Sequence, residues 1–267
     1  MLDFEFMSPT QFVFGRGAEE KVGGKLAERG AKKVLLHFGG QSAVRSGLID
    51  RVCASLDAAG VECVKLGGVR PNPEIELVRE GVALCKKEGV DWVLAVGGGS
   101  VIDSAKAIAN GACIDEDVWE LFATKRPNDN VLPIAVVLTI PAAGSEASKN
   151  TVISNDALGM KTGYGNEHQR PKLAFMNPEL TFTLPPYQTA AGITDMFCHL
   201  LERFFDDVGA VPVTDNLNLS LMRTVRAEAP RVLADPEDYE ARANIMWAGM
   251  LCHQGLAGVG RHEDWAT

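Results

Sequence analysis

The first two-thirds of the chain alternates short apolar runs with amphipathic stretches, and this alternation limits the possible folds more than any other feature. The apolar runs KKVLLHFG, VECVKLGG, DWVLAVGGG and VLPIAVVLTIP are predicted strands. Between them, SGLIDRVCASLDAAG, PEIELVREGVALCKKEG and SVIDSAKAIANG have the pattern of helices. Alternating strands and helices indicate a parallel sheet, and strands that are apolar on both faces indicate helices on both sides. We therefore predict a doubly wound α/β domain.

The character of the chain changes after NPELTFTLPPYQTAAG, where only helices are predicted, over residues 187–205, 215–233 and 239–258. Pro185 and Pro186 stop extended structure and suit the first turn of a helix. Pro230 predicts a kink or an early end of the second helix. The boundary near Leu184 divides the chain into an α/β domain, residues 1–184, and an all-α domain, residues 185–267. Because the sequence stops at RHEDWAT, which is typical of the approach to another helix, we expect the all-α domain to be incomplete.

Composition excludes several classes of protein. The 267 residues are 46% hydrophobic with a net charge of −9, which argues against binding nucleic acid or an anionic membrane surface. No apolar run approaches the roughly 20 residues of a membrane-spanning helix, and the N-terminus has no secretory signal pattern. The six cysteines are scattered without a CxxC pair. They predict reduced, mostly buried thiols in a cytoplasmic protein, where disulfides are rare.

The glycine run in WVLAVGGGSVIDSAKAIA is the strongest binding signal in the first domain. Gly97, Gly98, Gly99 and Ser100 lie between a predicted strand and a predicted helix, where free N–H groups attract phosphate and glycine lets a ligand approach the backbone. The alternative is a tight turn with Ser100 as the helix cap. The run matches neither the GxGxxG fingerprint nor a Walker loop. Asp103, in the first turn of the predicted helix, either complements the helix dipole or reaches a ribose or nicotinamide.

Two further loops have room for a ligand. In LLHFGGQSAVRSG, the position after the strand holds Gly39 and Gly40, with Ser42 and Arg45 nearby and no acidic residue. An acid at this position binds the ribose hydroxyls of NAD, whereas small or basic residues admit the extra phosphate of NADP; an ordinary turn is the alternative. The segment LTIPAAGSEASKNTVISN is rich in small and hydroxyl residues. Lys161 follows it and, taken alone, is typical of a solvated lysine.

The predicted helix GITDMFCHLLERFF carries a carboxylate and an imidazole on one face. Asp195 and His199 are four residues apart and therefore adjacent on the helix surface. They form either a surface or core Asp–His pair, or one edge of a zinc or ferrous iron site. A catalytic metal site needs at least three protein ligands, so these two are not sufficient. His37 and His168 belong to the other domain. His253 and His262 are close to each other in the sequence but have no partner at helical spacing, so they are poor candidates for further ligands.

Four segments in this order resemble the iron-containing (group III) metal-dependent alcohol dehydrogenases: GGGSVIDSAKAIA, LTIPAAGSEAS, NPELTFTLPPYQTAAGITDMFCHLLERFF and GRHEDWAT. The resemblance extends from FVFGRGAEEKVG to the last residue. Within the family the pattern is most similar to the NADPH-dependent butanol dehydrogenases and broad aldehyde reductases. This resemblance implies an N-terminal dinucleotide-binding domain, a helical C-terminal domain and an active site in the cleft between them.

The resemblance also implies roles for individual residues. Gly97, Gly98, Gly99 and Ser100 hold the pyrophosphate, with Asp103 nearby. Thr139 and Ser145 lie against the cofactor, the segment 180–184 lines the cofactor cleft, and Lys161 lies close to the nicotinamide. Members that prefer NAD(H) carry an acid where this chain has Gly39 and Gly40, so NADP(H) is expected here.

The metal site is where the chain departs from the family pattern. The family's divalent metal has four protein ligands, and Asp195 and His199 match the first two. The third ligand normally follows the DWAT tract and the fourth comes later, whereas this sequence ends at Thr267. His262 precedes the tract and is not the third ligand by register. We therefore expect weak metal binding and little or no turnover for this chain.

The resemblance implies an oxidoreductase that transfers hydride between NAD(P)H and an aldehyde or primary alcohol, with Fe²⁺ or Zn²⁺ as Lewis acid. A cytoplasmic homodimer with a small aldehyde or alcohol substrate, and with neither nucleic acid nor membrane as partner, is expected. One alternative is a dehydroquinate synthase-like lyase, which needs a strongly basic pocket that TAAGITDMFCHLLERFF does not provide. The other is a non-catalytic nucleotide-binding remnant.

Overall fold

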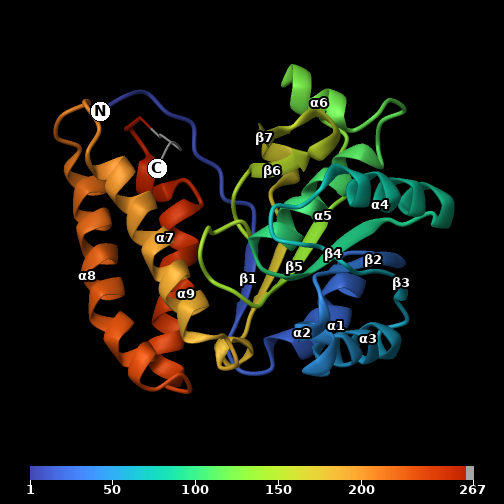
Figure 1. Cartoon of the computed structure of the whole chain (residues 1–267), viewed down its shortest axis with the longest axis horizontal. Coiled ribbons are helices and arrows are strands. Elements are labelled where there is room, and N and C mark those ends of the chain that lie inside the picture. Colours follow the sequence, from blue (N-terminus) through green and yellow to red (C-terminus); the bar gives the residue numbers. More distant parts are fainter. Residues whose placement is uncertain (263–267) are drawn as a thin grey trace. The chain divides into compact units, whose positions relative to one another are not determined.

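The computed structural model describes residues 1–262 and divides into two compact units (Figure 1). The α/β unit contains Pro9–Thr139 and Lys149–Met176. The helical unit contains Met1–Ser8, Ile140–Ser148 and the chain from Asn177 onward. The N-terminal segment and the loop Ile140–Ser148 therefore belong with the helices, although both are far from them in the sequence.

A six-stranded parallel sheet forms the centre of the α/β unit, in the order β1-β8-β5-β4-β2-β3. Its strands are β1 (Gln11–Phe14), β2 (Lys33–Phe38), β3 (Glu62–Leu66), β4 (Trp92–Gly97), β5 (Ile134–Leu138) and β8 (Leu173–Met176). Its helices are α1 (Val22–Glu28), α2 (Gln41–Arg45), α3 (Leu48–Ala58), α4 (Ile75–Glu88), α5 (Gly99–Gly111) and α6 (Trp119–Thr124). Short 3-10 turns occupy Ala18–Lys21, Asp156–Leu158 and Glu167–Gln169. The doubly wound parallel sheet predicted from the sequence is confirmed.

Helices cover both faces of this sheet. Figure 1 shows α1, α2 and α3 on one side and α4 and α5 on the other. Every residue of β4, β5 and β8 is buried, as strands covered on both faces require. A Cβ on Gly81 of α4 would lie 2.4 Å from Ile108 Cδ1 of α5 and 3.1 Å from Leu66 Cδ2 of β3. Glycine at this position therefore lets α4 pack closely against both elements.

Several parts of the α/β unit were not predicted. They include the short helices α1, α2 and α6, of five to seven residues each. β1 and β8 are only four residues long, which leaves too short a pattern to detect. β6 (Asn150–Asn155) and β7 (Met160–Gly165) form a separate antiparallel hairpin within what the sequence indicated only as a loop. The backbone N–H of Ser154 in β6 donates to the Pro73 carbonyl, which joins the hairpin to the segment before α4.

Three long helices make up most of the helical unit: α7 (Pro186–Phe204), α8 (Pro212–Ala234) and α9 (Tyr239–His253). Two 3-10 turns, Pro178–Thr181 and Leu256–Gly258, accompany them. Ile193, Met196 and Leu200 of α7 share one stripe and bury it against α8 and α9. The third helix ends at His253 and not, as predicted, at residue 258.

The early end predicted at Pro230 is wrong, because α8 continues to Ala234. Pro230 cannot donate the backbone hydrogen bond of a helix interior. Val225 and Val232, on either side of it, are both buried in the core of the helical unit. Packing on both sides therefore holds the helix together despite the missing bond.

Within residues 1–262, no helix has the length and apolar character needed to cross a membrane.

Candidate functional site

The two predicted glycine loops follow neighbouring strands at the point where the order of the sheet reverses. After β2 the chain forms β3 on one side of it, and then β4 on the other side. Gly39 and Gly40 follow β2, and α5 begins at Gly99, directly after β4. A Cβ on Gly39 would lie 3.5 Å from Val101 Cγ2, and one on Gly97 would lie 2.5 Å from the same atom. Both loops therefore meet over Val101, in the first turn of α5.

The glycines of these loops serve different purposes. A side chain at Gly97 would collide with Val101, so glycine is needed there for packing. A Cβ on Gly40 or Gly99 would meet no atom within 4 Å, and neither residue has a positive φ angle. Neither packing nor backbone conformation therefore requires glycine at positions 40 and 99. A ligand that approaches the backbone closely would require it.

The N-terminus of α5 is capped by Gly98, without a side-chain hydrogen bond to the cap. The alternative in which Ser100 caps this helix is therefore wrong, because Ser100 lies inside the first turn. The first N–H groups of a helix have no partner within the helix. Ser100 and Gly99 are only partly buried, so this end of the helix is accessible to an anion.

Asp103 lies in the second turn of α5 and not in the first, as predicted, because the helix begins at Gly99. Its Oδ2 accepts a hydrogen bond from the Val152 N–H at 2.9 Å, and its carbonyl oxygen accepts one from the Thr151 hydroxyl at 2.8 Å. Asp103 therefore attaches the β6–β7 hairpin to α5. Thr139, which follows β5, donates its N–H to the Gly97 carbonyl at 3.0 Å and lies beside the glycine run.

Lys161 and Ser42 lie at more exposed positions of the same unit. Ser42 belongs to α2, a helix without a buried residue that is capped by Gly40. Lys161 of β7 donates to Asn72 Oδ1 at 2.8 Å, and Asn72 has a φ of 58°. Lys161 thus contacts the loop between β3 and α4, which is itself tied to the other predicted loop because the Gly68 N–H donates to the Gly39 carbonyl.

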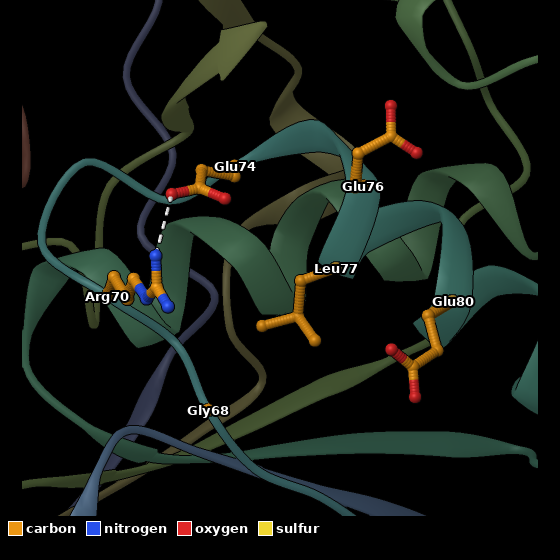
Figure 2. A pocket seen from close by; sticks show the side chains of 6 residues that line it. All are labelled: Gly68, Arg70, Glu74, Glu76, Leu77 and Glu80. Atoms are coloured by element: carbon orange, nitrogen blue, oxygen red, sulfur yellow. Dashed lines mark ion pairs between the residues drawn. The ribbon is translucent and has the colours of Figure 1, made fainter. Parts of the chain in front are cut away.

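This loop leads into a cavity of about 280 Å³ that the sequence did not indicate. Figure 2 shows its lining residues: Gly68, Arg70, Glu74, Glu76, Leu77 and Glu80. Arg70 and Glu74 point toward one another, with 3.9 Å between Nη1 and Oε1. The lining contains one basic side chain and three carboxylates, so the cavity wall carries a net negative charge.

In the helical unit, Asp195 and His199 lie one turn apart on α7. His199 Nε2 is 3.5 Å from Asp195 Oδ1. Two donors that each lie about 2.1 Å from one tetrahedral ion are about 3.4 Å apart, so this separation fits chelation. The His199 side chain is 15% exposed and Asp195 is 42% exposed. Burial lowers the pKa of His199 more than the Asp195 charge raises it, which favours the neutral imidazole that a metal requires.

His253 lies beside His199, although the sequence indicated no role for it. The two ring centroids are 4.3 Å apart, and Arg203 Nη2 lies 3.3 Å from His253 Nδ1. Since a guanidinium can only donate, His253 Nδ1 accepts the hydrogen bond. The sequence did not indicate this contact because spacing along one helix does not reveal neighbours on another helix. The contact arises from the packing of α7 against α9.

The predicted cofactor residue Ser145 belongs to the helical unit, unlike the other predicted cofactor residues. The loop Ile140–Ser148 packs against both α7 and α9. A Cβ on Gly192 would lie 2.6 Å from the Pro141 carbonyl oxygen, and one on Gly144 would lie 2.8 Å from His253 Cβ. Ser145 is buried. The loop thus brings Ser145 into the same unit as Asp195, His199 and His253.

Asp195 and His199 are suitable in chemistry and spacing for a metal, but residues 1–262 contain no group of three His, Cys, Asp or Glu side chains arranged to hold one. Glu202 Oε2 lies 3.6 Å from His199 Nδ1, on the other side of the ring. The His262 N–H donates to Asp206 Oδ2 at 2.9 Å. The predicted DWAT tract, residues 264–267, lies outside the described residues.

The helical unit has a cavity of about 470 Å³, and most of the residues that line it are close to His199 in the sequence. It is lined by Cys198, Leu201, Glu202, Phe205, Asp206, Asp207 and His262. Cys198 precedes His199 directly, and Glu202 contacts its ring. The wall combines three carboxylates with the exposed apolar side chains of Leu201 and Phe205.

Comparison with known proteins connects these features. Residues 9–178 match the sequence model of the iron-containing alcohol dehydrogenases, and residues 189–266 match that of the C-terminal part of the same family. The chain is 42% identical over its whole length to the probable NADH-dependent butanol dehydrogenase 1 of Bacillus subtilis. It is 35% identical to the NADPH-dependent aldehyde reductase YqhD of Escherichia coli, again over its whole length. It spans 69% of the length of each of these relatives.

A solved structure gives the same assignment. The NADH-dependent butanol dehydrogenase A of Thermotoga maritima matches with a TM-score of 0.95 and 41% identity, over 98% of this chain and 66% of that one. Both the α/β part and the helical part are thus shared with alcohol dehydrogenases that use NADH or NADPH. From its sequence matches and its fold, this chain belongs to the iron-containing alcohol dehydrogenase family of NAD(P)-dependent oxidoreductases.

Proposed function

We propose that this chain takes part in hydride transfer between NAD(P)H and an aldehyde or primary alcohol. One observation carries the proposal: the two glycine loops meet at the carboxyl ends of β2 and β4, where the strand order reverses. In open α/β sheets this is the position at which nucleotides bind. The relatives named as butanol dehydrogenases and as an aldehyde reductase support the substrate class.

The residues of the α/β unit supply the binding functions in this proposal. The N–H groups of Gly99 and Ser100 at the start of α5 face an anion-binding position and hold the cofactor pyrophosphate. Gly40 and Gly99 leave space for the cofactor to approach the backbone. Thr139, at the end of the adjacent β5, contributes a hydroxyl beside the same loop. Lys161, whose ammonium is held by Asn72, contributes a positive charge.

Asp195 and His199 supply two ligands to a divalent metal in this proposal. Their 3.5 Å separation and the lowered pKa of His199 support it, and a carboxylate with an imidazole suits both Fe²⁺ and Zn²⁺. A bound metal supplies Lewis-acid polarisation of the substrate carbonyl. The protein groups around it orient this pair: Arg203 donates to the His199 carbonyl at 2.7 Å and to His253, which keeps the histidine rings together.

NADP(H) is proposed as the preferred cofactor. The segment from Gly39 to Ser42 contains no acid that would bind ribose hydroxyls, and the space at Gly40 is open. The glutamates that line the nearby cavity act in the opposite direction, because they repel an additional phosphate. The preference for NADP(H) over NAD(H) therefore depends on whether the ribose lies closer to Gly40 or to these glutamates.

A cofactor-binding protein without turnover is the second candidate. The observation that favours it is the donor set, since the described residues provide two metal ligands where a catalytic site needs at least three. Both candidates require NADPH to bind at the α/β unit. They differ in whether metal-dependent chemistry follows.

The test measures binding and chemistry separately. NADPH binding is followed by the change in its fluorescence, and oxidation of NADPH by butyraldehyde is followed after chelator treatment, with and without added Fe²⁺ or Zn²⁺. The dehydrogenase proposal predicts binding together with turnover that requires the metal and is lost in Asp195→Asn and His199→Ala. Binding without turnover supports the second candidate, and failure to bind NADPH contradicts both.

The homodimer and the cytoplasmic location remain predictions from the sequence. Sedimentation of the purified chain and fractionation of cells that express it measure them directly.

A further inference from the structure

Two cysteines and a lysine lie together at the edge of the α/β unit, on elements that the proposed function does not use. Cys53 belongs to α3, and Cys63 and Lys65 belong to β3, which is the outermost strand of the sheet. All six cysteines of the chain are free thiols. The prediction of mostly buried thiols was wrong, because only Cys85 and Cys252 are buried. Cys53 and Cys63 are among the four that are partly buried and thus within reach of solvent.

The strand geometry places Cys63 and Lys65 on the face that α3 covers. Leu66 packs against α4, since its Cδ2 atom would lie 3.1 Å from a Cβ on Gly81. Side chains alternate between the two faces of a strand, so Cys63 and Lys65 point to the face opposite Leu66. Helix α3 packs against β3, and α3 and α4 lie on opposite sides of the sheet (Figure 1).

The helix geometry places Cys53 on the flank of α3 that points away from α1. Ile49, Val52 and Leu56 form the buried stripe of α3. The Ser55 carbonyl lies against Gly23 of α1 and marks one flank of that stripe. Cys53 is two residues earlier, about 200° around the helix, and therefore lies on the other flank. The arrangement brings the Cys53 sulfur to the face of β3 that carries Cys63.

The contacts among the three side chains agree with this placement. Cys63 and Cys53 share a side-chain hydrogen bond, and Lys65 hydrogen-bonds to Cys53. Burial, followed by the neighbouring Cys53, raises the pKa of Cys63 to about 12. The hydrogen bond and charge of Cys53 raise the pKa of Lys65. Lys65 thus places an ammonium group beside the Cys53 sulfur.

We propose that Cys53 and Cys63 form a two-thiol oxidation site, in which Cys53 reacts first with a low-molecular-weight disulfide and Cys63 then closes an intramolecular disulfide. In the first step, the Cys53 thiolate attacks one sulfur of the disulfide and releases one thiolate. In the second, Cys63 attacks the Cys53 sulfur, loses its proton and releases the other thiolate. The two protein thiols lose two electrons, and the small disulfide is reduced to two thiols.

The pairing explains why Cys63 acts second. Burial, and then the neighbouring Cys53, raise the pKa of Cys63 to about 12, so Cys63 is the poorer nucleophile while both thiols are reduced. In the mixed disulfide, Cys63 lies next to the Cys53 sulfur that it attacks. Closing the bond brings the sulfurs to about 2.05 Å. β3 can make this shift because β2 is its one neighbour in the sheet.

The full chain treated with glutathione disulfide tests the proposal directly. Trypsin cleaves after Arg51 and Lys65, so one peptide, residues 52–65, contains both cysteines. We expect this peptide to lose the mass of two hydrogen atoms, to resist alkylation and to recover both thiols on reduction. Cys85, which is buried, is expected to remain reduced in the same sample.

Three variants separate the two steps. Cys63→Ser should accumulate a stable glutathione adduct on Cys53, whereas Cys53→Ser should form neither the adduct nor the disulfide. Lys65→Met should slow the first step several-fold, because the thiolate loses its cation; intact-protein mass measures this rate. Lys87→Met, at a lysine that is 78% exposed, is the matched control and should leave the rate unchanged.

Three results would overturn the proposal. They are a peptide that stays fully reduced, a glutathione adduct on Cys53 that persists in the unmodified chain, and first reaction at Cys63. None of these results depends on dehydrogenase activity, so they leave the proposed function untouched.

Discussion

His199 Nε2 lies 3.5 Å from Asp195 Oδ1 across one turn of α7, which is close to the separation of two ligands on one tetrahedral metal ion. We expect His199→Ala and Asp195→Asn each to weaken Co²⁺ binding at least tenfold, because each removes one donor. Calorimetric titration with Co²⁺ measures the effect, and the cobalt absorption spectrum reports the ligand geometry.

His168→Ala is the matched control for this prediction. His168 Nε2 lies 3.6 Å from Asp129 Oδ1, but these side chains are 56% and 87% exposed. Few protein contacts therefore fix their positions. Its loss should leave Co²⁺ binding unchanged. If His168→Ala weakens binding as much as His199→Ala does, the metal is bound non-specifically.

Gly99→Ala and Gly97→Ala distinguish a glycine kept for a ligand from one kept for packing. A methyl group at Gly99 meets no atom within 4 Å, whereas one at Gly97 lies 2.5 Å from Val101 Cγ2. Gly99→Ala should leave the free energy of unfolding nearly unchanged and weaken NADPH binding about tenfold, because it obstructs the approach to a phosphate. Gly97→Ala should lower the free energy of unfolding by about 1–3 kcal/mol. Urea denaturation and NADPH fluorescence titration measure the two effects; an unchanged NADPH affinity in Gly99→Ala would exclude close approach at this position.

Gly40→Asp tests the basis of cofactor preference. An acidic side chain at the end of β2 can bind ribose hydroxyls and repels a 2′-phosphate. We expect the ratio of NADPH to NADH dissociation constants to rise at least tenfold. Gly24→Asp adds the same charge at another open glycine, in α1, and should leave the ratio unchanged. Equal shifts in both variants would mean that the overall charge, and not the position, sets the preference.

His37 predicts a loss of stability in mild acid. Its ring is fully buried, and Nδ1 lies 2.9 Å from the Leu66 carbonyl oxygen, which can only accept, so Nδ1 carries the proton. Nε2 then accepts from the Ser104 hydroxyl at 2.8 Å. Burial lowers the pKa of His37 from 6.5 to about 4.

The lowered pKa of His37 means that acid destabilises the folded chain. Below pH 6.5 the unfolded chain binds a proton that the folded chain excludes, so stability falls as the pH drops from about 6.5 to about 4. The loss from this group is at most roughly 3 kcal/mol. Urea denaturation at several pH values should show a shallower acid slope for His37→Gln than for the unmodified chain. Parallel slopes for the two proteins would contradict the prediction.

Gly144→Ala tests how tightly the loop Ile140–Ser148 is held against α9. Gly144 has a φ of 56°, and its Cβ would lie 2.8 Å from His253 Cβ. Gly159 has a similar φ of 60° in open space. Gly159→Ala should therefore cost only about 1–2 kcal/mol of left-handed strain. Gly144→Ala should cost about 1–3 kcal/mol more, because the methyl group also crowds His253. Thermal unfolding of both variants compares their stability. Equal losses of stability would show that the loop shifts to accommodate the methyl group.

The sequence by itself determined the features that depend on neighbouring residues. The strands β2 to β5 and the helices α3, α4 and α5 follow from periodicity, because backbone geometry repeats every two residues in a strand and every 3.6 in a helix. The glycine run before α5 and the i, i+4 spacing of Asp195 and His199 are likewise local. The short strands β1 and β8 gave too few residues for a pattern, and the length of α8 beyond Pro230 depended on core packing.

Only the tertiary structure decided which distant segments meet. The pairing of β2 with β4 brings Gly39 and Gly97 to the same Val101 side chain, and the packing of α7 against α9 places His253 beside His199. The covering of β3 by α3 brings Cys53 to Cys63 in the same way. These contacts depend on how apolar faces pack together, and packing is a property of the whole chain that no local spacing contains.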